Sequence, residues 1–419
     1  MYMVPIREYG VFWGFAIGYI NSRSNLERSE RKSLFLNMAK LDYDYIIIGA
    51  GASGLLLADA LGKDSFFSQK SILLLDKDAK KNNDRTWCFW EKGKGEFDTI
   101  LYKVWNQILF KGQEFSKSYT IEPYAYKMVR GIDFYEHYLE RLKGYPNIRF
   151  EQDAVTEVKD SEECVSVHTQ ENEYRCQKVF DSRFNYEMIE AEGSYPVLQQ
   201  HFVGWIVKTP KPVFEVDQTT YMDFSVPQKG NTRFMYVLPF KEDEALVEYT
   251  LFSKELLPKT DYEEAIHDYL QNKLHCDTYE ILEREQGSIP MTCYDFGQRN
   301  SERIIHIGTA GGWAKPSTGY TFMGSSKKIP LLISNLKSDN NMHDLGQKKR
   351  FWFYDLLLLD VLYNNNEKGH QIFTSLFKKR KPQLIFKFLD EETSFREELQ
   401  FISGCPNLPF IKAIFKRLF

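Results

Sequence analysis

Three glycines close to residue 50 constrain the fold of this chain more than any other feature. Gly49, Gly51 and Gly54 form a GxGxxG pattern between an apolar run at 45–48 and a segment at 53–61 with helical periodicity. The missing side chains allow a tight turn, a close approach of pyrophosphate and close packing of the helix on the strand. The pattern therefore predicts a strand, a turn and a helix whose N-terminus faces the phosphates of a dinucleotide. The residues expected at that position are Gly49, Gly51, Ala52, Ser53 and Gly54.

A carboxylate follows where the ribose of a dinucleotide would lie. Asp76 ends a second apolar run at 71–75, about 20 residues after the last glycine of the pattern. An acid at this position accepts hydrogen bonds from ribose hydroxyls and repels a 2′-phosphate, which disfavours NADP. Because the sequence has no second GxGxxG pattern, we expect one resident dinucleotide, and FAD rather than NAD.

The rest of the chain predicts an α/β protein with two further parts. We expect a doubly wound, Rossmann-like FAD-binding domain over residues 41–345, interrupted by an antiparallel β-sheet substrate domain at about 84–130 and 190–290. Residues 346–419 have helical patterns and are predicted to form a helical C-terminal region that faces a membrane. Residues 1–40 are predicted to be a disordered N-terminal extension.

Charge, cysteine usage and hydrophobicity exclude several classes of protein. The 419 residues carry 54 Lys and Arg against 58 Asp and Glu, and a net charge of -4 gives no general attraction for nucleic acid. The six cysteines show no CxxC spacing, which argues against a metal site and a disulfide scaffold and favours the reducing cytoplasm. The apolar run at 11–20 has about half of the ~20 residues that a membrane-spanning helix needs.

Three longer segments are more distinctive than the glycines. They read NDRTWCFWE at 83–91, RFMYVLPF and ALVEYTLF within 233–252, and IGTAGGWAKPSTGYTF at 307–322. From about residue 43 to the C-terminus, the chain resembles the lycopene cyclase family, in particular its FAD-dependent β-cyclases. The resemblance implies a non-covalent FAD that acts in its reduced form, with NAD(P)H as a candidate external reductant. It also implies the closure of β-ionone rings on a linear carotene without net oxidation.

The resemblance assigns the catalytic acid to Glu248, and the local pattern agrees with that role. Residues 233–240 and 245–252 read as two strands joined by a charged turn, and positions 246, 248, 250 and 252 share one face. Both faces are largely apolar, so we expect a buried carboxyl group whose pKa is raised by desolvation. Such an acid can protonate an alkene. The alternatives that stay open are a structural ion pair, for example with Arg233, and a carboxylate that faces water.

Ring closure by this route passes through a carbocation that the protein has to stabilise. Protonation of a terminal double bond gives a tertiary cation, the next double bond attacks it, and loss of a proton restores the acid. The aromatic faces of the DRTWCFW segment can stabilise a cation, and core packing is the alternative reading of the same residues. The residues proposed to surround substrate and cation are Asp84, Trp87, Phe89 and Trp90, and Arg85 is placed near the cofactor.

A second glycine-rich stretch is expected to contact the flavin. It follows an apolar run at 303–307, and Thr309 stands where many flavoproteins have an aspartate that bonds the ribityl chain. Asp181, at the end of another predicted strand, is a weaker candidate for cofactor contact, and a plain turn is the alternative for the stretch itself. The residues assigned to the cofactor here are Gly308, Thr309, Ala310, Gly311, Ser317, Thr318 and Gly319.

The C-terminal tail combines apolar and basic residues. Residues 371–419 contain nine Phe and nine Lys or Arg, including the basic run 378–381. This combination is typical of reversible binding to an anionic membrane surface, where a linear carotene would be dissolved. The alternative is an ordinary solvated face of helices packed on the core.

The sequence thus predicts a cytoplasmic, peripherally membrane-associated isomerase that converts lycopene to β-carotene through γ-carotene. Lycopene or another linear carotenoid, the membrane surface and other enzymes of carotenoid synthesis are the expected partners. The alternatives are an FAD-dependent monooxygenase, a prenyl-chain reductase and a non-catalytic carotenoid-binding flavoprotein. The number of cyclised ends, the ring type, the electron donor and the oligomeric state are left open.

Overall fold

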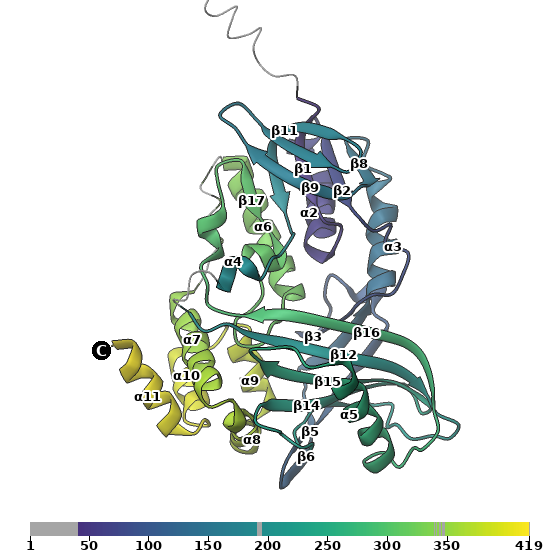
Figure 1. Ribbon diagram of the computed structural model, residues 1–419, viewed down its shortest axis with the longest axis vertical. Helices are drawn as coiled ribbons and strands as arrows, with labels where there is room; N and C mark the ends of the chain where they lie inside the picture. Colours follow the sequence, from purple (N-terminus) through teal and green to yellow (C-terminus); the bar gives the residue numbers. More distant parts are fainter. Residues whose placement is uncertain are drawn as a thin grey trace, which may run out of the picture.

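The computed structural model describes residues 41–190, 195–338 and 348–418, together with positions 340, 342 and 345. The predicted N-terminal extension at 1–40 lies outside the described residues. Figure 1 shows a first sheet with its helices at one end of the molecule, a larger sheet at the other end, and the C-terminal helices beside the larger sheet.

The first sheet is built around the predicted strand, turn and helix. Its central strands are parallel and almost completely buried, as the unbroken apolar run before Gly49 predicts. Two antiparallel strands extend one side. In spatial order the strands are β8 (Ile148–Gln152), β2 (Ile72–Asp76), β1 (Tyr43–Ile48), β11 (Glu173–Asp181), β10 (Val165–Thr169) and β9 (Val155–Asp160), and β17 (Ile304–His306) also pairs with β11.

Helices cover one face of this sheet. Tyr45, Ile47 and Phe180 pack against α2 (Ala52–Lys63), α3 (Gly131–Leu142) and α6 (Phe322–Ser338). On the opposite face, Ile46 and Ile48 pack with residues of β9, β10 and β11, so the antiparallel strands bury that side. The short helix α4 (Glu187–Glu190) follows β11. Both faces of the parallel strands are therefore shielded from water, which an all-parallel segment requires.

The larger sheet is mainly antiparallel and forms the floor of the site described below. Its strands in spatial order are β16 (Glu280–Met291), β12 (Leu198–Lys208), β15 (Glu244–Ser253), β14 (Thr232–Lys241), β13 (Gln218–Asp223), β5 (Gln107–Gly112) and β6 (Phe115–Thr120). Helix α5 (Lys259–Asn272) packs on its outer face through residues such as Tyr262 and Ile266. A smaller sheet, β3 (Thr86–Lys92), β7 (Tyr124–Arg130) and β4 (Lys103–Trp105), connects the two ends of the molecule.

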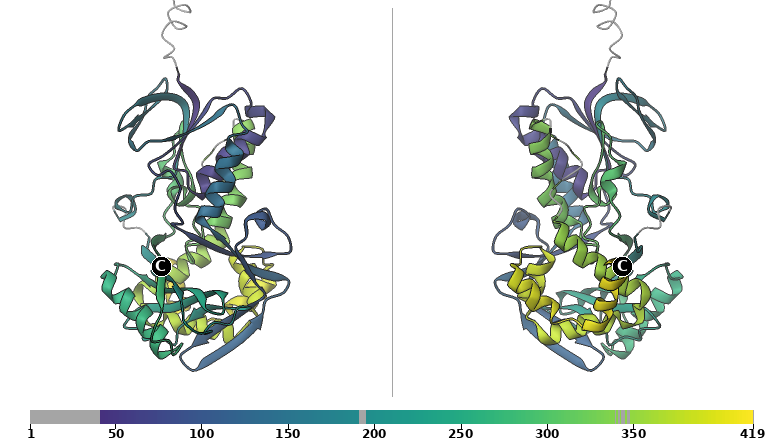
Figure 2. Two further views of the ribbon diagram at one scale, coloured as in Figure 1. Left: turned by 90° about the vertical axis from the view of Figure 1, so that its right-hand side faces the viewer. Right: turned by 90° about the vertical axis from the view of Figure 1, so that its left-hand side faces the viewer.

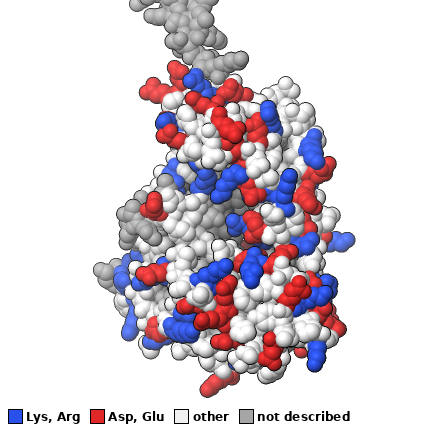
Figure 3. Space-filling model, turned by 45° about the vertical axis from the view of Figure 1, so that its right-hand side comes forward, with Lys and Arg blue, Asp and Glu red and all other residues white. Residues whose placement is uncertain are grey.

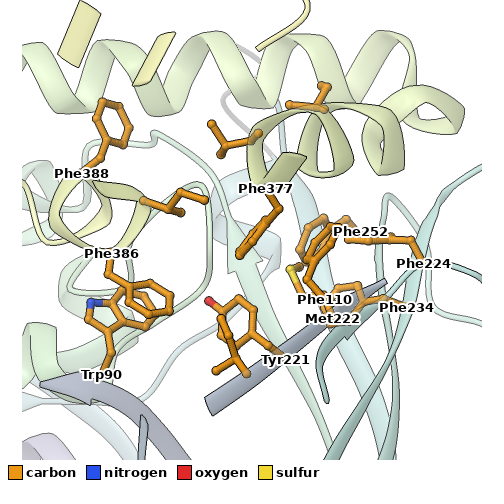
Figure 4. Close-up of a cluster of buried hydrophobic side chains, with 14 of the residues drawn as sticks. Trp90, Phe110, Tyr221, Met222, Phe224, Phe234, Phe252, Phe377, Phe386 and Phe388 are labelled. Carbon is orange, nitrogen blue, oxygen red and sulfur yellow. The ribbon is translucent and has the colours of Figure 1, made fainter. Parts of the chain in front are cut away.

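The C-terminal helices cover the inner face of the larger sheet. In Figure 4, Phe377 and Phe386 lie between these helices and the sheet residues Phe110 and Tyr221. The ring centroids of Phe110 and Phe377 are 4.2 Å apart, and those of Tyr221 and Phe386 are 5.8 Å apart. Figure 2 shows the helices gathered beside the larger sheet. They are α7 (Lys349–Asn364), α8 (Gly369–Lys379), α9 (Pro382–Leu389), α10 (Phe395–Ile402) and α11 (Asn407–Leu418).

The predicted fold class is confirmed: a Rossmann-like α/β part, an antiparallel sheet and a helical C-terminal region are all present. The predicted helix at 53–61 is a little longer, and the two predicted strands on either side of the charged turn at 241–244 form the hairpin β14–β15. The division into domains by residue number stays a prediction. Among the described residues, no helix is both long and apolar enough to cross a bilayer.

Candidate active site

A cavity of about 990 Å³ connects the first sheet to the C-terminal helices. Its walls come from the turn after β1, from β3, from the inner face of β14 and β15, from β16 and from α7 to α11. Figure 3 shows a hollow between the two ends of the molecule, with Lys and Arg side chains around it. The size is at the upper end of the range for ligand pockets. The cavity can therefore hold more than one small group at the same time.

The predicted phosphate turn forms one end of this cavity. Gly49, Gly51, Ala52 and Ser53 line it, while Gly54 lies behind the turn. A Cβ atom on Gly54 would be 1.9 Å from the carbonyl oxygen of Gly49, so the turn excludes any side chain there. A Cβ atom on Gly51 would meet no atom of the described residues within 4 Å, so the space above it is open. The helix start of α2 thus borders a space in which phosphate groups could bind.

Asp76 is the last residue of the neighbouring strand β2, the position at which the sequence predicts a carboxylate for a ribose. Its carboxylate accepts hydrogen bonds from the backbone N–H groups of Ala50 at 2.6 Å and Asp78 at 2.8 Å, and it lines the cavity. The ammonium group of Lys80 lies 3.3 Å from Asp76 Oδ2. The cations that line this part of the cavity are Lys77, Lys80, Arg85 and Arg183. Their positive charge is complementary to a pyrophosphate.

The second glycine-rich stretch faces the same end of the cavity. Gly308 packs so closely on the start of α2 that a Cβ atom would lie 2.6 Å from Ser53 Oγ. Ala310 and Gly311 are behind the cavity wall, where a Cβ atom on Gly311 would be 2.3 Å from the carbonyl oxygen of His306. The members of the stretch that line the cavity are Gly308, Thr309, Ser317, Thr318 and Gly319.

Asp181 does not reach the cavity. It is buried, and both of its carboxylate oxygens accept hydrogen bonds from the guanidinium group of Arg183. The weaker candidate for cofactor contact is therefore engaged in a local ion pair, and Arg183 rather than Asp181 lines the cavity.

The residues at this end fit a dinucleotide cofactor. The open space above Gly51, the carboxylate at the end of β2 and the basic side chains match the sugar and phosphate groups. The side-chain oxygen of Gln200 is buried at the cavity, and it has no hydrogen-bond donor among the described residues. A bound group that carries an N–H could supply that donor.

Strand β15 presents its predicted face to the cavity. Leu246, Glu248, Thr250 and Phe252 all line it. The alternate residues Ala245, Val247, Tyr249 and Leu251 pack on the other side of the sheet with α5. The twofold periodicity of the strand therefore brings one carboxyl group into an otherwise largely apolar wall.

Glu248 lies in surroundings that favour its neutral form. Its Oε1 atom accepts a hydrogen bond of 2.6 Å from the hydroxyl of Thr250. Burial raises the pKa of Glu248, and the negative charge of nearby Glu285 raises it further. The ion-pair alternative is not realised, because the Arg233 guanidinium bonds the hydroxyl of Tyr249 at 3.2 Å and Asn231 Oδ1 at 2.6 Å.

Glu285 was not recognised as a site residue from the sequence. It lies on β16, lines the cavity, and its Oε2 atom accepts a hydrogen bond of 2.8 Å from Thr86. Burial raises the pKa of Glu285 as well. The approach of the two glutamates depends on strand β12, which lies between their strands in space but not in sequence. No local pattern signals such a long-range pairing.

The residues of the DRTWCFW segment divide between cavity and core. Arg85 and Trp87 line the cavity. Asp84 lies outside it and accepts a hydrogen bond of 2.8 Å from the hydroxyl of Tyr135. Phe89 packs against Phe97 and Phe322, and Trp90 stacks on Phe386 and donates from Nε1 to Asp390 at 2.8 Å. Phe89 and Trp90 are thus too deep in the core to touch a ligand in the cavity.

Beyond the glutamates the cavity becomes aromatic and then apolar. Four of the six tyrosines that line the cavity form a cluster, in which the hydroxyls of Tyr126 and Tyr236 are 2.5 Å apart. The other two members of the cluster are Tyr221 and Tyr320, whose hydroxyls are 3.4 Å apart. The far end lies among α7 to α11 and is lined by side chains such as Phe353, Phe373, Phe377, Phe388, Phe401 and Phe410. This end suits an elongated hydrocarbon.

Known structures share this architecture at low sequence identity. A geranylgeranyl bacteriochlorophyll reductase-like protein from Thermoplasma acidophilum has a TM-score of 0.62 at 10% identity, covering 88% of this chain and 98% of the other. Halogenase PltM, solved with phloroglucinol and FAD, has a TM-score of 0.56 at 11% identity over 88% of this chain and 87% of the other. A flavoprotein/dehydrogenase from Cytophaga hutchinsonii has a TM-score of 0.54 at 14% identity, covering 83% of this chain and 92% of the other. These similarities establish the flavoprotein fold.

Sequence comparison adds the family. A lycopene β-cyclase from Paracoccus sp. (strain N81106 / MBIC 01143) is 26% identical over 229 residues. That alignment covers 51% of this chain and 58% of the relative, so it spans little more than half of the relative's length. The model of the family described as "Lycopene cyclase protein" matches residues 44–415, which include the phosphate turn, the hairpin with Glu248 and most of the C-terminal helices. The chain therefore belongs to the lycopene cyclase family.

Proposed function

We propose that this protein is a lycopene β-cyclase, an isomerase that closes β-ionone rings on the ends of lycopene without net redox change. The observation that carries the proposal is the position of Glu248. It lines a single cavity that has a dinucleotide cradle at one end and an apolar, aromatic-walled section at the other. A neutral acid at that junction could meet the terminal double bond of a hydrocarbon that enters from the apolar side.

FAD is the cofactor that this cradle fits best. The residues proposed to hold it are those of the two glycine-rich stretches that line the cavity, together with Asp76, Arg85 and Gln200. FAD in its reduced form would supply negative charge beside a cationic intermediate. NAD(P)H is proposed as an external electron donor that keeps the cofactor reduced.

The proposed reaction begins with proton transfer from Glu248. The proton forms a C–H bond at the terminal double bond of the polyene, and a tertiary cation results. The next double bond attacks this cation, a six-membered ring closes, and the positive charge moves to a ring carbon. Loss of a ring proton then makes the ring double bond, so the product has the mass of the substrate.

Trp87 is the residue of the DRTWCFW segment best placed to stabilise the cation. It lines the cavity, and its ring is held by Phe322 at a centroid distance of 5.1 Å and by Phe134 at 5.0 Å. An aromatic face contributes about 0.5–2 kcal/mol of cation stabilisation in a desolvated site. We retain Asp84, Phe89 and Trp90 as residues that support this wall from outside the cavity.

Helices α10 and α11 are proposed to bind the membrane surface from which the substrate enters. Their exposed apolar side chains include Phe395, Leu408 and Phe415, which are 67%, 73% and 60% exposed. Ile402 and Ile411 on the same helices are partly exposed and also line the cavity. The cavity therefore opens beside an apolar surface, as a lipid-dissolved substrate would require.

The direct test is to supply lycopene in anionic liposomes to the purified protein, with FAD that has been chemically reduced without oxygen. We expect a cyclic product of unchanged mass, first with one ring and then with two. A product heavier by oxygen would indicate a monooxygenase, and one heavier by hydrogen a prenyl-chain reductase. Bound flavin with no product would indicate a non-catalytic carotenoid-binding protein.

A further inference from the structure

Glu248 and Glu285 occupy equivalent positions on the two strands that flank β12. Gly204 of β12 is the register partner of Glu248 on β15 and of Glu285 on β16. A Cβ atom on Gly204 would lie 3.1 Å from Glu285 Cγ and 3.4 Å from Glu248 Cβ. The missing side chain of Gly204 thus lets the two carboxyl groups approach each other across the middle strand.

Each glutamate is also oriented by a separate hydroxyl. Thr250 donates to Glu248 from the same strand, whereas Thr86 donates to Glu285 from the start of β3. Both carboxyl groups line the cavity. Two carboxylates in such close, poorly hydrated positions cannot both be ionised at low cost, so a pair of this kind holds one proton between its members.

The other ionisable groups around the pair come from three elements. Cys88 of β3 and Tyr236 of β14 face Glu248, and burial raises the pKa of both of these groups, so they are neutral near pH 7. Arg85, before β3, lies on the side of Glu285 and lowers its pKa, and Glu283 on β16 acts in the opposite direction. Because Arg85 and Thr86 stabilise the ionised form of Glu285, the proton of the pair resides on Glu248.

We propose that Glu285 is the base of the cyclisation: it removes the ring proton and returns it to Glu248. This inference rests on the proposed function of the site. Glu248 first gives its proton to the terminal double bond. After ring closure, the C–H bond at the ring carbon that carries the polyene breaks, its electron pair forms the ring double bond, and the proton goes to the Glu285 carboxylate. Transfer of that proton to Glu248 restores the starting state, with no oxidant or reductant consumed.

Two properties follow from one shared proton. Activity should fall at low pH, where both carboxyl groups are protonated and the base is lost. It should also fall at high pH, where both are ionised and the acid is lost. The ring type is fixed as well, because a base that takes the proton from the carbon bearing the polyene gives only β rings.

The test compares Glu285→Gln with the wild-type protein and with Glu280→Gln as a matched control. Glu280, at the start of the same strand, is exposed and does not line the cavity. Glu285→Gln should lower the rate of β-ring formation by about 10²- to 10⁴-fold. It should also yield rings whose double bond lies at another position, or products in which water has added to the cation. In addition, the alkaline limb of the pH–rate profile should move to lower pH. Glu280→Gln should behave like the wild type in all three respects.

A merely structural role for Glu285 would slow the reaction and leave the ring type and the pH profile unchanged, and that result would overturn the proposal. Infrared spectroscopy of the substrate-free protein gives an independent measurement. We expect one protonated carboxyl group that titrates above the ordinary range, disappears in Glu248→Gln, and titrates at lower pH in Glu285→Gln. A band unaffected by Glu285→Gln would exclude the shared proton. A wild-type protein that has the shared proton but makes no cyclic product would instead contradict the proposed function.

Discussion

At the residue scale, Glu248 derives its proposed reactivity from what surrounds it. The strand places it in an apolar wall, Thr250 fixes one oxygen, and Glu285 adds a like charge across Gly204. The apolar wall and the charge of Glu285 favour the protonated form of Glu248 over the ionised form. The hydrogen bond from Thr250 has the opposite effect on the pKa, but it orients the carboxyl group. The balance leaves an acid that is neutral at a pH where most glutamates are ionised.

Replacing the acid should abolish turnover and leave the protein folded. Glu248→Gln keeps the shape and the hydrogen bond to Thr250 but has no proton to donate to an alkene. We expect kcat/KM for lycopene to fall by at least about 10²- to 10⁴-fold, with FAD still bound. Glu242→Gln, in the exposed turn between β14 and β15, is the control and should retain full activity. Cyclisation at the wild-type rate by Glu248→Gln would refute the assignment.

Gly204 offers a second residue-scale prediction. In Gly204→Ala the new Cβ atom would be 3.0 Å from Leu246 Cδ1 and 3.1 Å from Glu285 Cγ, so the neighbouring side chains must move apart. We expect a loss of about 1–3 kcal/mol in the free energy of unfolding and a lower alkaline limit of activity, because the two carboxyl groups separate. Denaturant titration and a pH–rate profile measure the two effects. Gly144→Ala, after α3, is the control; if it moved the profile equally, the effect would not be local to the pair.

The sequence predicts Glu248 and its face because both depend on one strand. Alternation along β15 is a local property, so positions 246, 248, 250 and 252 could be placed together before the fold was known. The positions of Glu285 and Gly204 beside Glu248 depend on the pairing of β12 with both β15 and β16, and that pairing joins segments far apart in the chain. Local patterns hold no information about such a neighbour.

At the scale of elements, the turn between β1 and α2 separates two roles of glycine. Gly54 supports the close packing of helix on strand, whereas Gly51 borders open space. Gly54→Val should therefore lower protein stability, and Gly51→Val should leave the thermal unfolding of the cofactor-free protein nearly unchanged while weakening FAD binding at least tenfold. Flavin fluorescence titration measures the second effect. A Gly51→Val protein that binds FAD normally would contradict the placement of the phosphates at this turn.

The end of β15 is tied to β12 and α5 by a buried histidine. His201, only 1% exposed, bonds Ser253 Oγ through Nε2 and the hydroxyl of Tyr262 through Nδ1, both at 2.6 Å. Burial first, and the positive charge of Arg233 second, lower the pKa of His201 to about 4. The unfolded chain binds this proton below about pH 6.5, whereas the folded protein resists it until about pH 4. Stability should thus decline as the pH falls through this window.

The expected decline is on the order of 3 kcal/mol in the free energy of unfolding between pH 6.5 and pH 4. Denaturant titrations at pH 7 and pH 4.5 can measure most of it. His201→Gln should be less stable at pH 7, because a buried hydrogen bond is lost, but its stability should depend less on pH. An unchanged pH dependence in this variant would show that other groups cause the acid destabilisation.

Strand β3 shows the limit of element-level prediction. The sequence predicts that its aromatic residues line the site together, but other aromatic side chains pack against two of them. Trp87 borders the cavity, while Phe89 is enclosed by Phe97 and Phe322. Trp90 is fixed by Phe386 and Asp390 from the C-terminal helices. Which aromatic residue meets a ligand was therefore decided by elements that come much later in the chain.

At the scale of the whole molecule, one cavity joins parts with different chemistry. The dinucleotide cradle comes from the two glycine-rich stretches at 49–54 and 308–319, the acid from the larger sheet and the apolar end from the last helices. Lys315, whose side chain is 11% exposed, links these parts, because its ammonium group contacts Asp355 of α7 at 3.0 Å and Glu391, after α9, at 3.1 Å. A bound cofactor beside residues 317–319 and a substrate among the C-terminal helices would thus share one continuous wall.

Membrane binding is the prediction that belongs to this scale, because it concerns where the cavity opens. Phe395→Ser, Leu408→Ser and Phe415→Ser together remove apolar side chains that are exposed on α10 and α11 beside the basic residues Lys412 and Lys416. Since burial of each such side chain at a membrane contributes on the order of 1.5–3 kcal/mol, partition onto anionic liposomes should weaken at least tenfold. Liposome flotation measures the change. Phe66→Ser with Leu256→Ser, at other exposed apolar positions, should have no effect. If both sets of replacements reduced flotation equally, the binding would not be specific to the surface at the cavity opening.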